Sequence, residues 1–132
     1  MQTFLPDADF AKSLALLDFR RLGKQRVEAY QLIRALTVGT GWSRHPAALM
    51  WRGHVNALKC YYNLALEEWV RRGYRNNMKK MPIRGRIVMP PIVGHERFHA
   101  AHRSNLLRKD PLFYGRWGWK EPPNLPYIWK VG

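Results

Sequence analysis

Between His54 and Arg72, apolar residues recur at three- and four-residue steps, and this pattern constrains the fold more than any other. Such spacing places the apolar side chains on one face of an α-helix. Gly73 follows directly, and glycine commonly ends a helix. We therefore predict an amphipathic helix that ends at Gly73. Its packed face consists of Val55, Leu58, Tyr62, Ala65, Leu66 and Trp69.

A second helix is predicted over Asp18–Leu36, with Gly39 and Gly41 as stop signals. Its apolar face contains Leu22, Ala29, Leu32, Ile33 and Leu36. A single acid, Glu28, lies in this helix among Arg20, Arg21, Lys24, Arg26 and Arg34. An ordinary surface ion pair between Lys24 and Glu28, one turn apart, is one interpretation, and a functional carboxylate is the other.

The remaining segments also favour helices. Asp7 is the expected N-cap of a short helix through Leu17, Pro46 suits the first turn of another, and a further helix is expected over His95–Lys109. No strand pattern is found, so the fold class is all-α. With 132 residues and 46% hydrophobic content, we expect one compact domain of four to five helices spanning residues 1–132.

Two segments lack helical periodicity. Residues 74–94 form a long basic loop that carries Arg75, Lys79, Lys80, Arg84 and Arg86. Loops of this length are often functional or mobile. The last 21 residues are rich in aromatic side chains interleaved with cations. We expect most of these rings to pack on the helices, and Trp117 and Trp119, which alternate with glycines, to be the better contacts for nucleic acid.

The charge balance indicates a polyanionic partner. Lysine and arginine number 23 against nine acids, which gives a net charge of +14. Nucleic acid is the first candidate, and an anionic membrane surface is the weaker one. The single cysteine, Cys60, excludes an internal disulfide and a multi-cysteine zinc site. The sequence contains neither a signal peptide nor a long apolar run, so we expect a cytoplasmic, nucleoid-associated protein.

His95, Glu96 and His99 spell HExxH, a pattern that on a helix can bind zinc beside a glutamate base. A catalytic zinc needs a third protein ligand, and His102 lies on nearly the same face without matching a known spacing. The alternative is a glutamate that complements the helix dipole in the first turn. We therefore rank a zinc metalloprotease third among the possible functions and expect no metal.

The end of the same helix, HRSNLLRK, gathers side chains that suit phosphate oxygens. Arg103, Asn105 and Arg108 are the candidate DNA-binding residues in this segment. A solvated cationic helix end is the competing interpretation.

Several motifs together resemble one family. MQTFLP, RLGKQRVE, RGHV, WVRRGY, PPIVGHE and DPLFYGRWGW occur in an order that is similar to the pyrimidine dimer DNA glycosylase family, the phage endonuclease V type with its bacterial relatives. The resemblance implies an all-α domain that uses no cofactor. It also implies a glycosylase with abasic-site lyase activity, in which the N-terminal amine attacks C1′, expels the base, forms a Schiff base and cleaves the strand by β-elimination.

The resemblance assigns roles to individual residues. The family's catalytic glutamate falls on Glu28, and because Gln2 is too bulky for efficient methionine removal, Met1 would supply the amine. The resemblance implies DNA contacts by Arg21, Arg26, Arg103, Arg108, Trp117 and Trp119. The residue pattern itself adds Arg20, Lys24 and Asn105 as candidate DNA-binding residues.

The expected partner is double-stranded DNA with a damaged or modified base, bound by a monomer. Which lesion is recognised stays open, as does RNA binding. The competing function is a non-catalytic DNA- or RNA-binding module in which Glu28 is structural.

Overall fold

The computed structural model describes residues 1–130, and within them the chain is all-α, as predicted, with six α-helices, one 3-10 helix and no strand. Two of the six helices are single turns, and every helix except Pro111–Tyr114 corresponds to a predicted one. The elements are α1 (Phe10–Ala15), α2 (Phe19–Val38), α3 (Pro46–Leu49), α4 (Val55–Arg71), α5 (Glu96–Lys109), α6 (Pro111–Tyr114) and η1 (Gly115–Trp117).

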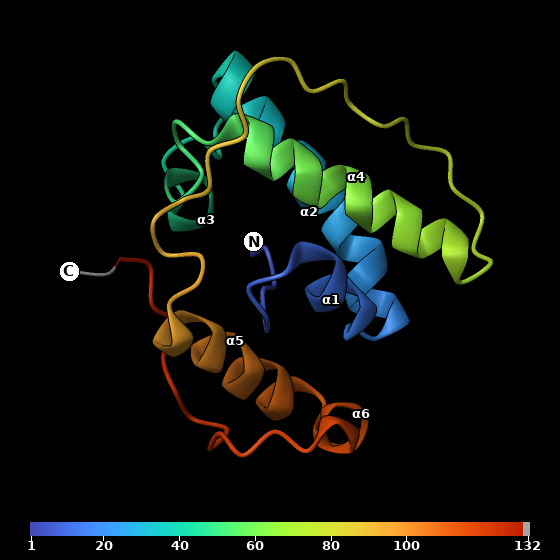
Figure 1. Ribbon diagram of the computed structural model, residues 1–132, viewed down its shortest axis with the longest axis vertical. Helices are drawn as coiled ribbons and strands as arrows, with labels where there is room; N and C mark the ends of the chain where they lie inside the picture. The colour runs from blue at the N-terminus through green and yellow to red at the C-terminus, as the bar shows by residue number, and fades with distance from the viewer. Residues whose placement is uncertain (131–132) are drawn as a thin grey trace.

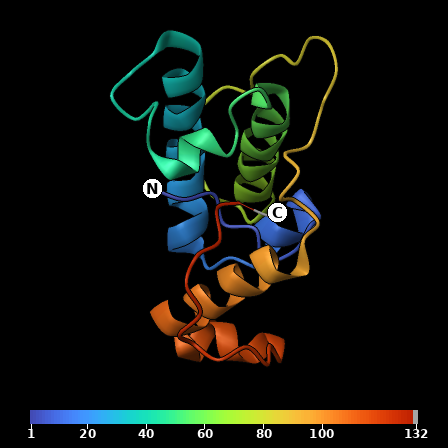
Figure 2. The same cartoon turned by 90° about the vertical axis from the view of Figure 1, so that its left-hand side faces the viewer.

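Helices α2 and α4 lie side by side and form the centre of the fold, while α5 and α6 lie together at one end (Figures 1 and 2). The apolar faces predicted for both long helices supply the core, and α1 packs against α4. Gly23 lies where the α2 backbone approaches Trp69 of α4, and a Cβ there would meet the indole ring at 3.2 Å. α2 is continuous through Gly23, and the missing side chain lets the two helices pack closely at this point.

The helix ends follow from local chemistry, with two differences from prediction. Asp18 caps α2 by accepting the Arg21 N–H, and Gly39 ends the helix in the left-handed region at φ 84°, two residues later than expected. The predicted N-cap of α1, Asp7, is wrong, because Asp9 accepts the Lys12 N–H. The backbone of Asp7 is instead held by the Ser13 hydroxyl.

The first six residues are extended and pass between the helices, and most of this segment is buried (Figure 1). Gln25 of α2 donates to Gln2 O at 2.9 Å and accepts the Phe4 N–H at 2.9 Å. The Tyr61 hydroxyl of α4 lies 2.8 Å from Phe4 O and 2.6 Å from Gln25 Oε1. Buried side chains thus replace the backbone partners that an isolated extended segment lacks.

Helix α5 holds the next residues of the same segment. His102 Nδ1 accepts the Leu5 N–H at 2.8 Å, and His99 Nδ1 lies 2.7 Å from Leu5 O. His99 Nε2 accepts the Gly94 N–H at 2.9 Å, so Nδ1 is the ring nitrogen that donates to Leu5 O. Arg103 adds a hydrogen bond of 2.8 Å to Pro6 O. Three side chains of α5 therefore fix the path of the N-terminal segment.

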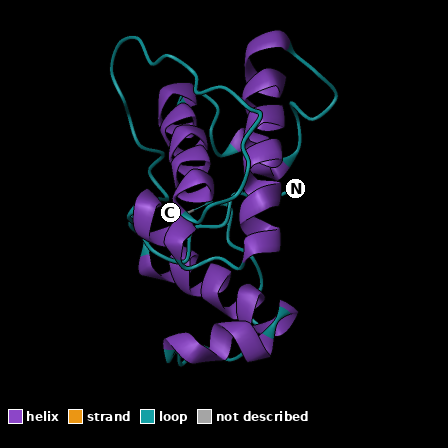
Figure 3. Cartoon of the chain, turned by 90° about the vertical axis from the view of Figure 1, so that its right-hand side faces the viewer, coloured by secondary structure: helices purple, strands orange, loops and turns teal. Residues whose placement is uncertain are grey.

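The aromatic tail folds back along α5, as expected for most of its rings. Ser104 and Asn105 of α5 hydrogen-bond the backbone of Pro122 and Leu125. Trp119 stacks on Tyr114 at 5.7 Å with nearly parallel rings. Residues 74–94 have no helix or strand, in agreement with the predicted loop, and run beside α4 (Figure 3).

In the part of the chain from residue 1 to residue 130, none of the helices combines the length and apolar character that a membrane crossing requires.

We expect Gln25→Ala to lower the free energy of unfolding by roughly 3 kcal/mol, because it leaves the buried Phe4 N–H and Gln2 carbonyl without partners. Urea denaturation followed by tryptophan fluorescence measures the change. Gln31→Ala, an exposed glutamine of the same helix, is the control and should alter stability by less than about 0.5 kcal/mol. Equal effects of the two substitutions would contradict the proposed role of Gln25.

Candidate active site

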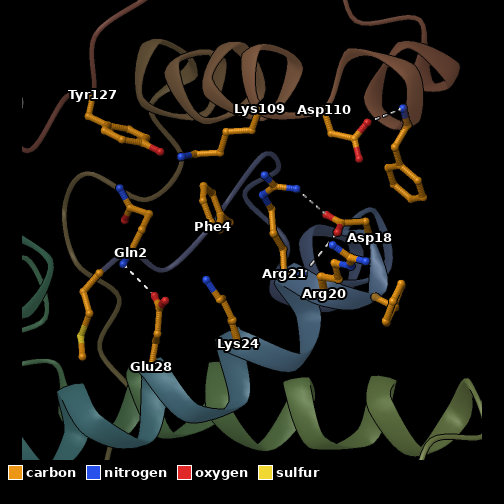
Figure 4. Close-up of a pocket in the computed structure, with 13 residues that line it drawn as sticks. Gln2, Phe4, Asp18, Arg20, Arg21, Lys24, Glu28, Lys109, Asp110 and Tyr127 are labelled. Carbon is orange, nitrogen blue, oxygen red and sulfur yellow. Dashed lines mark hydrogen bonds and ion pairs between the residues drawn. The ribbon is translucent and has the colours of Figure 1, made fainter.

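A cleft of about 820 Å³ opens between the first half of α2, the N-terminal segment and the junction of α5 with α6 (Figure 4). It contains Glu28, the acid singled out in the sequence, together with the first residue of the chain. The lining residues are Met1, Gln2, Phe4, Asp18, Phe19, Arg20, Arg21, Lys24, Glu28, Lys109, Asp110, Phe113 and Tyr127.

Glu28 is half-buried, and its Oε2 accepts the backbone N–H of Gln2 at 3.0 Å. The predicted surface pair with Lys24 is not formed, since no ion pair involves either side chain within residues 1–130. Oε1 likewise has no protein hydrogen bond from this part of the chain. The carboxylate is therefore anchored through one oxygen and open to a ligand through the other.

The N-terminal amine lies close to this carboxylate. Three covalent bonds separate the Met1 amine from the Gln2 nitrogen, so these two atoms are within about 4 Å of each other. Adding the 3.0 Å hydrogen bond brings the amine to within roughly 7 Å of Glu28 Oε2. Met1 itself lines the cleft. The cleft thus combines a primary amine and a carboxylate at a distance that one substrate atom can bridge.

His45 is a neighbour of both groups that the sequence did not single out. Burial lowers its pKa, the positive charge of the N-terminal amine lowers it further, and Glu28 acts in the opposite direction. Its Nδ1 accepts the Ala47 N–H at 3.0 Å as the N-cap of α3, which leaves Nε2 as the free nitrogen. The signal in the sequence was the His-Pro pair at the start of a short helix.

Cationic side chains from α2 and from the last turn of α5 line the same cleft as the Glu28 carboxylate. Arg21 is paired with Asp18 at 3.1 Å. Within residues 1–130, Arg20, Lys24 and Lys109 have no acidic partner. In Figure 4 the labelled side chains of Lys24 and Lys109 extend into the space between α2 and α5. These three cations are therefore available to phosphate oxygens.

Asp18 supports the arginine and joins two elements of the cleft. Burial alone would raise its pKa, but hydrogen bonds from Tyr114 and Arg21 and the charge of Arg21 outweigh burial and lower the pKa. Tyr114 also accepts the Asp18 N–H at 3.1 Å. The start of α2 is thereby fixed to α6, and this contact sets one wall of the cleft.

Aromatic side chains provide the apolar part of the cleft. Phe4, Phe19, Phe113 and Tyr127 line it, and half of the Phe19 surface is exposed. Burial raises the pKa of Tyr127. Sequence reasoning missed these rings and Lys109 as site residues, and all of them except Phe19 come from segments outside the helix of Glu28. Rings beside cations suit the stacking of a nucleobase next to its phosphates.

Several predicted DNA contacts lie elsewhere. Arg26 covers the Trp69 ring at 4.1 Å and donates to Asn76 at 3.2 Å, on the side of α2 that faces α4. Arg103 forms ion pairs with Glu96 and Glu121, and Asn105 is buried against the tail. These three side chains have structural partners, and a DNA contact by any of them stays a prediction.

The other predicted contacts lie near the surface. Arg108 is exposed and donates to Asn105. Trp117 is 39% exposed, and its indole N–H lies 3.2 Å from Leu16 O, whereas Trp119 is partly covered by its stacking on Tyr114. None of these three lines the cleft formed by the described residues. Of the predicted contacts, the structure brings Arg20, Arg21 and Lys24 together with Met1 and Glu28.

The HExxH pattern has a structural role. Both ring nitrogens of His99 are used by backbone groups, and His102 Nδ1 accepts the Leu5 N–H. Glu96 pairs with Arg103 instead of facing a metal. Among residues 1–130, no three histidine, cysteine or acidic side chains are grouped so that they could hold a metal ion. The arrangement gives the metalloprotease alternative no support.

Comparison with known proteins identifies one family. The family model described as pyrimidine dimer DNA glycosylase matches residues 1–82. The matched span contains the N-terminal segment, α2 with Glu28, and α4. A search of curated proteins found no significant match, and neither did a search of solved structures.

The buried imidazole of His102 predicts a pH-dependent stability. Burial lowers its pKa from 6.5 to about 3, so between these values the unfolded chain binds more protons than the folded chain. Stability is therefore lost as the pH falls through 6.5. From pH 7 to pH 5, His102 should account for about 2 kcal/mol of lost unfolding free energy.

His102→Asn tests this assignment, because the Asn Oδ1 can replace Nδ1 as acceptor for Leu5 N–H and does not titrate. Urea denaturation at pH 7 and pH 5 should show a smaller difference for this variant than for the wild type. His95→Asn changes an exposed histidine and serves as control. An unchanged pH dependence in His102→Asn would show that other groups carry the effect.

Proposed function

Because this chain belongs to the pyrimidine dimer DNA glycosylase family, we propose that its cleft removes a damaged or modified base from double-stranded DNA and cleaves the strand at the abasic site. The observation that carries this proposal is the hydrogen bond between the Gln2 N–H and Glu28, because it ties the start of the chain to the one carboxylate of α2 that faces the cleft.

The Met1 amine is the proposed nucleophile. Its nitrogen lone pair forms a bond to C1′ while the bond from C1′ to the base breaks, and the base leaves with that electron pair and takes up a proton. The nitrogen then loses a proton, and its lone pair opens the sugar ring by breaking the C1′–O4′ bond. O4′ takes up a proton, and a protonated Schiff base remains. Removal of a C2′ proton then expels the 3′ phosphate. A primary amine suits the first step, because its nitrogen lone pair can attack C1′ and the product can become an imine.

Glu28 has two proposed tasks in this sequence. Its negative charge stabilises the positive charge that develops at the sugar and on the imine nitrogen. Its free oxygen, Oε1, can move a proton between the sugar and solvent. The half-buried position strengthens both effects, since the carboxylate is only partly screened by water.

The remaining cleft residues fit DNA. Arg20, Lys24 and Lys109 would hold phosphates on either side of the lesion. Chemistry at C1′ of a stacked nucleotide requires local opening of the duplex. Phe19 and Tyr127 offer rings on which a displaced base can stack.

Replacing Glu28 with Gln should abolish strand cleavage and leave DNA binding largely intact. The amide oxygen can still accept the Gln2 N–H, so the N-terminus keeps its place while the charge is lost. Cleavage of an abasic duplex should fall by roughly a hundredfold or more. Glu67→Gln, at an exposed acid of α4, is the matched control and should retain activity. Retained cleavage by Glu28→Gln would refute the assignment.

Residues added before Met1 should remove cleavage and borohydride trapping, because the reactive amine then lies outside the cleft. A C-terminal extension of equal length is the control. Full activity of a stably N-extended protein would exclude the amine mechanism. Mass spectrometry of the trapped peptide identifies the attached residue, and an adduct on Gln2 after loss of Met1 would correct the nucleophile by one position.

A non-catalytic nucleic-acid-binding module is the second candidate. One contact favours it, since Glu28 accepts a backbone N–H of the N-terminal segment in the same way as the structural Gln25. Borohydride treatment of complexes with undamaged, abasic and thymine-dimer duplexes separates the two functions. A trapped adduct on the dimer duplex supports glycosylase and lyase chemistry, and an adduct on the abasic duplex alone supports only the lyase. Salt-sensitive binding without any adduct supports the module.

A further inference from the structure

A second basic surface follows α4 outside the cleft. We define the basic strap as residues 74–89, which are extended and run along α4 in the opposite direction to the helix (Figures 1 and 3). The side-chain amide of Asn63 in α4 accepts the Met81 N–H at 2.8 Å and donates to the Met81 carbonyl at 2.9 Å. Further hydrogen bonds to strap carbonyls come from His54, Asn56, Tyr62 and Trp69.

These contacts fix the strap through its backbone and leave its cationic side chains exposed. Asn56 donates to the carbonyls of both Arg84 and Arg86, at 2.8 and 2.9 Å. Gly85 between them has φ 89°, a conformation that lets both carbonyls turn toward the same amide. The two arginines are therefore held as a pair on a rigid backbone, which lowers the entropy cost of binding through them.

Almost none of the positive charge of the strap is compensated by acidic side chains. Residues 74–94 contain five cations and no acid. Within residues 1–130, only Lys80 has an acidic partner, Glu67 at 2.6 Å, and both side chains are about half exposed. Such a pair adds little stability. Arg75, Lys79, Arg84 and Arg86 thus repel one another without compensation in this part of the chain, which is expected of a surface that binds a polyanion.

The size of the surface fits duplex DNA. The residues that anchor the strap run from His54 to Trp69, which is about 22 Å along the helix axis. Duplex DNA carries one phosphate charge per roughly 1.7 Å of its axis, so a duplex along the strap presents several phosphates to these cations.

The strap is separate from the candidate active site. Among the described residues that line the cleft, none comes from α4 or from the strap. The cleft opens toward α5 and α6, whereas the strap lies outside α4 (Figures 1 and 4). A short duplex in the cleft therefore leaves the strap free.

We propose that the basic strap binds the phosphate backbone of a second duplex DNA segment while the cleft holds the segment with the lesion. This inference rests on the proposed function only in taking duplex DNA as the partner. Contacts to two segments would let the enzyme keep hold of DNA while it searches for a lesion.

The test uses a variant that removes three cations of the strap without touching the cleft. The substitutions are Lys79→Gln, Arg84→Gln and Arg86→Gln. A control variant removes the same charge from exposed positions outside the strap. Its substitutions are Lys12→Gln, Arg97→Gln and Lys120→Gln. Unchanged urea denaturation curves show that both variants fold.

The wild-type protein is first saturated with a short duplex that contains a non-cleavable abasic analogue. A labelled undamaged duplex of about 14 base pairs, long enough to span the strap, is then added and its binding is measured by fluorescence anisotropy at increasing salt. We expect the wild type and the control variant to bind this second duplex. The strap variant should lose that binding. If it retains some, a plot of the logarithm of its binding constant against the logarithm of salt concentration should have a slope smaller in magnitude by about 2.7, for three lost phosphate contacts.

Three results would overturn the inference. These are no second duplex on the wild type, equal binding by the strap variant, and preferential binding of duplex RNA or anionic vesicles over DNA. Borohydride trapping on a short abasic duplex is measured in parallel, so that failure of the strap proposal can be distinguished from failure of the proposed function. If the strap variant loses the second duplex but the wild type forms no adduct, the strap proposal stands and the proposed chemistry is rejected. If the wild type forms an adduct but the strap variant still binds the second duplex, the chemistry stands and the strap proposal is rejected.

Discussion

The burial of an extended N-terminal segment is the constraint on which the rest of the structure depends. An extended chain with no neighbouring strand has backbone groups that must find partners elsewhere. Here the partners are side chains from three helices, with Gln25 of α2, Tyr61 of α4 and His102 of α5 as central members. The same contacts join the three helices through the segment, which therefore acts as a core element. Its first residue, Met1, thereby lines the cleft.

The segment runs antiparallel to α2, and this direction explains the position of Glu28. Gln25 accepts the Phe4 N–H, and Glu28, one turn later, accepts the Gln2 N–H. The two side chains make equivalent contacts, but Gln25 is buried while Glu28 lies at the edge of the core, beside the first residue. A structural row of hydrogen bonds therefore ends in a carboxylate next to an amine. The backbone contact occupies only one of the two Glu28 oxygens, so the other stays open to a ligand.

The cations of this protein divide into two classes that charge alone does not separate. Arg26 and Arg103 are tied to Trp69 and to acids of the tail, where they hold elements together. Lys24, Lys109 and the strap arginines have no such partner within residues 1–130 and face solvent. Two histidines likewise have a structural role. His99 and His102 hydrogen-bond the Leu5 backbone, although the histidine spacing of this helix resembles a metal-binding motif. Residue type limits what a side chain can do, and its neighbours decide what it does.

The sequence by itself determined the all-α class, the long helices and the place of Glu28 as the one acid among the cations of its helix, because helical periodicity and an isolated acid are local properties of the chain. It also marked Arg20, Arg21 and Lys24, which share the first turns of one helix with Glu28. Only the tertiary structure brought Lys109, Tyr127 and His45 toward Glu28 and the N-terminus, and only it attached the basic loop to α4. These contacts join residues far apart in the chain, and their geometry depends on the path of a buried segment whose hydrogen-bond partners no local pattern reveals.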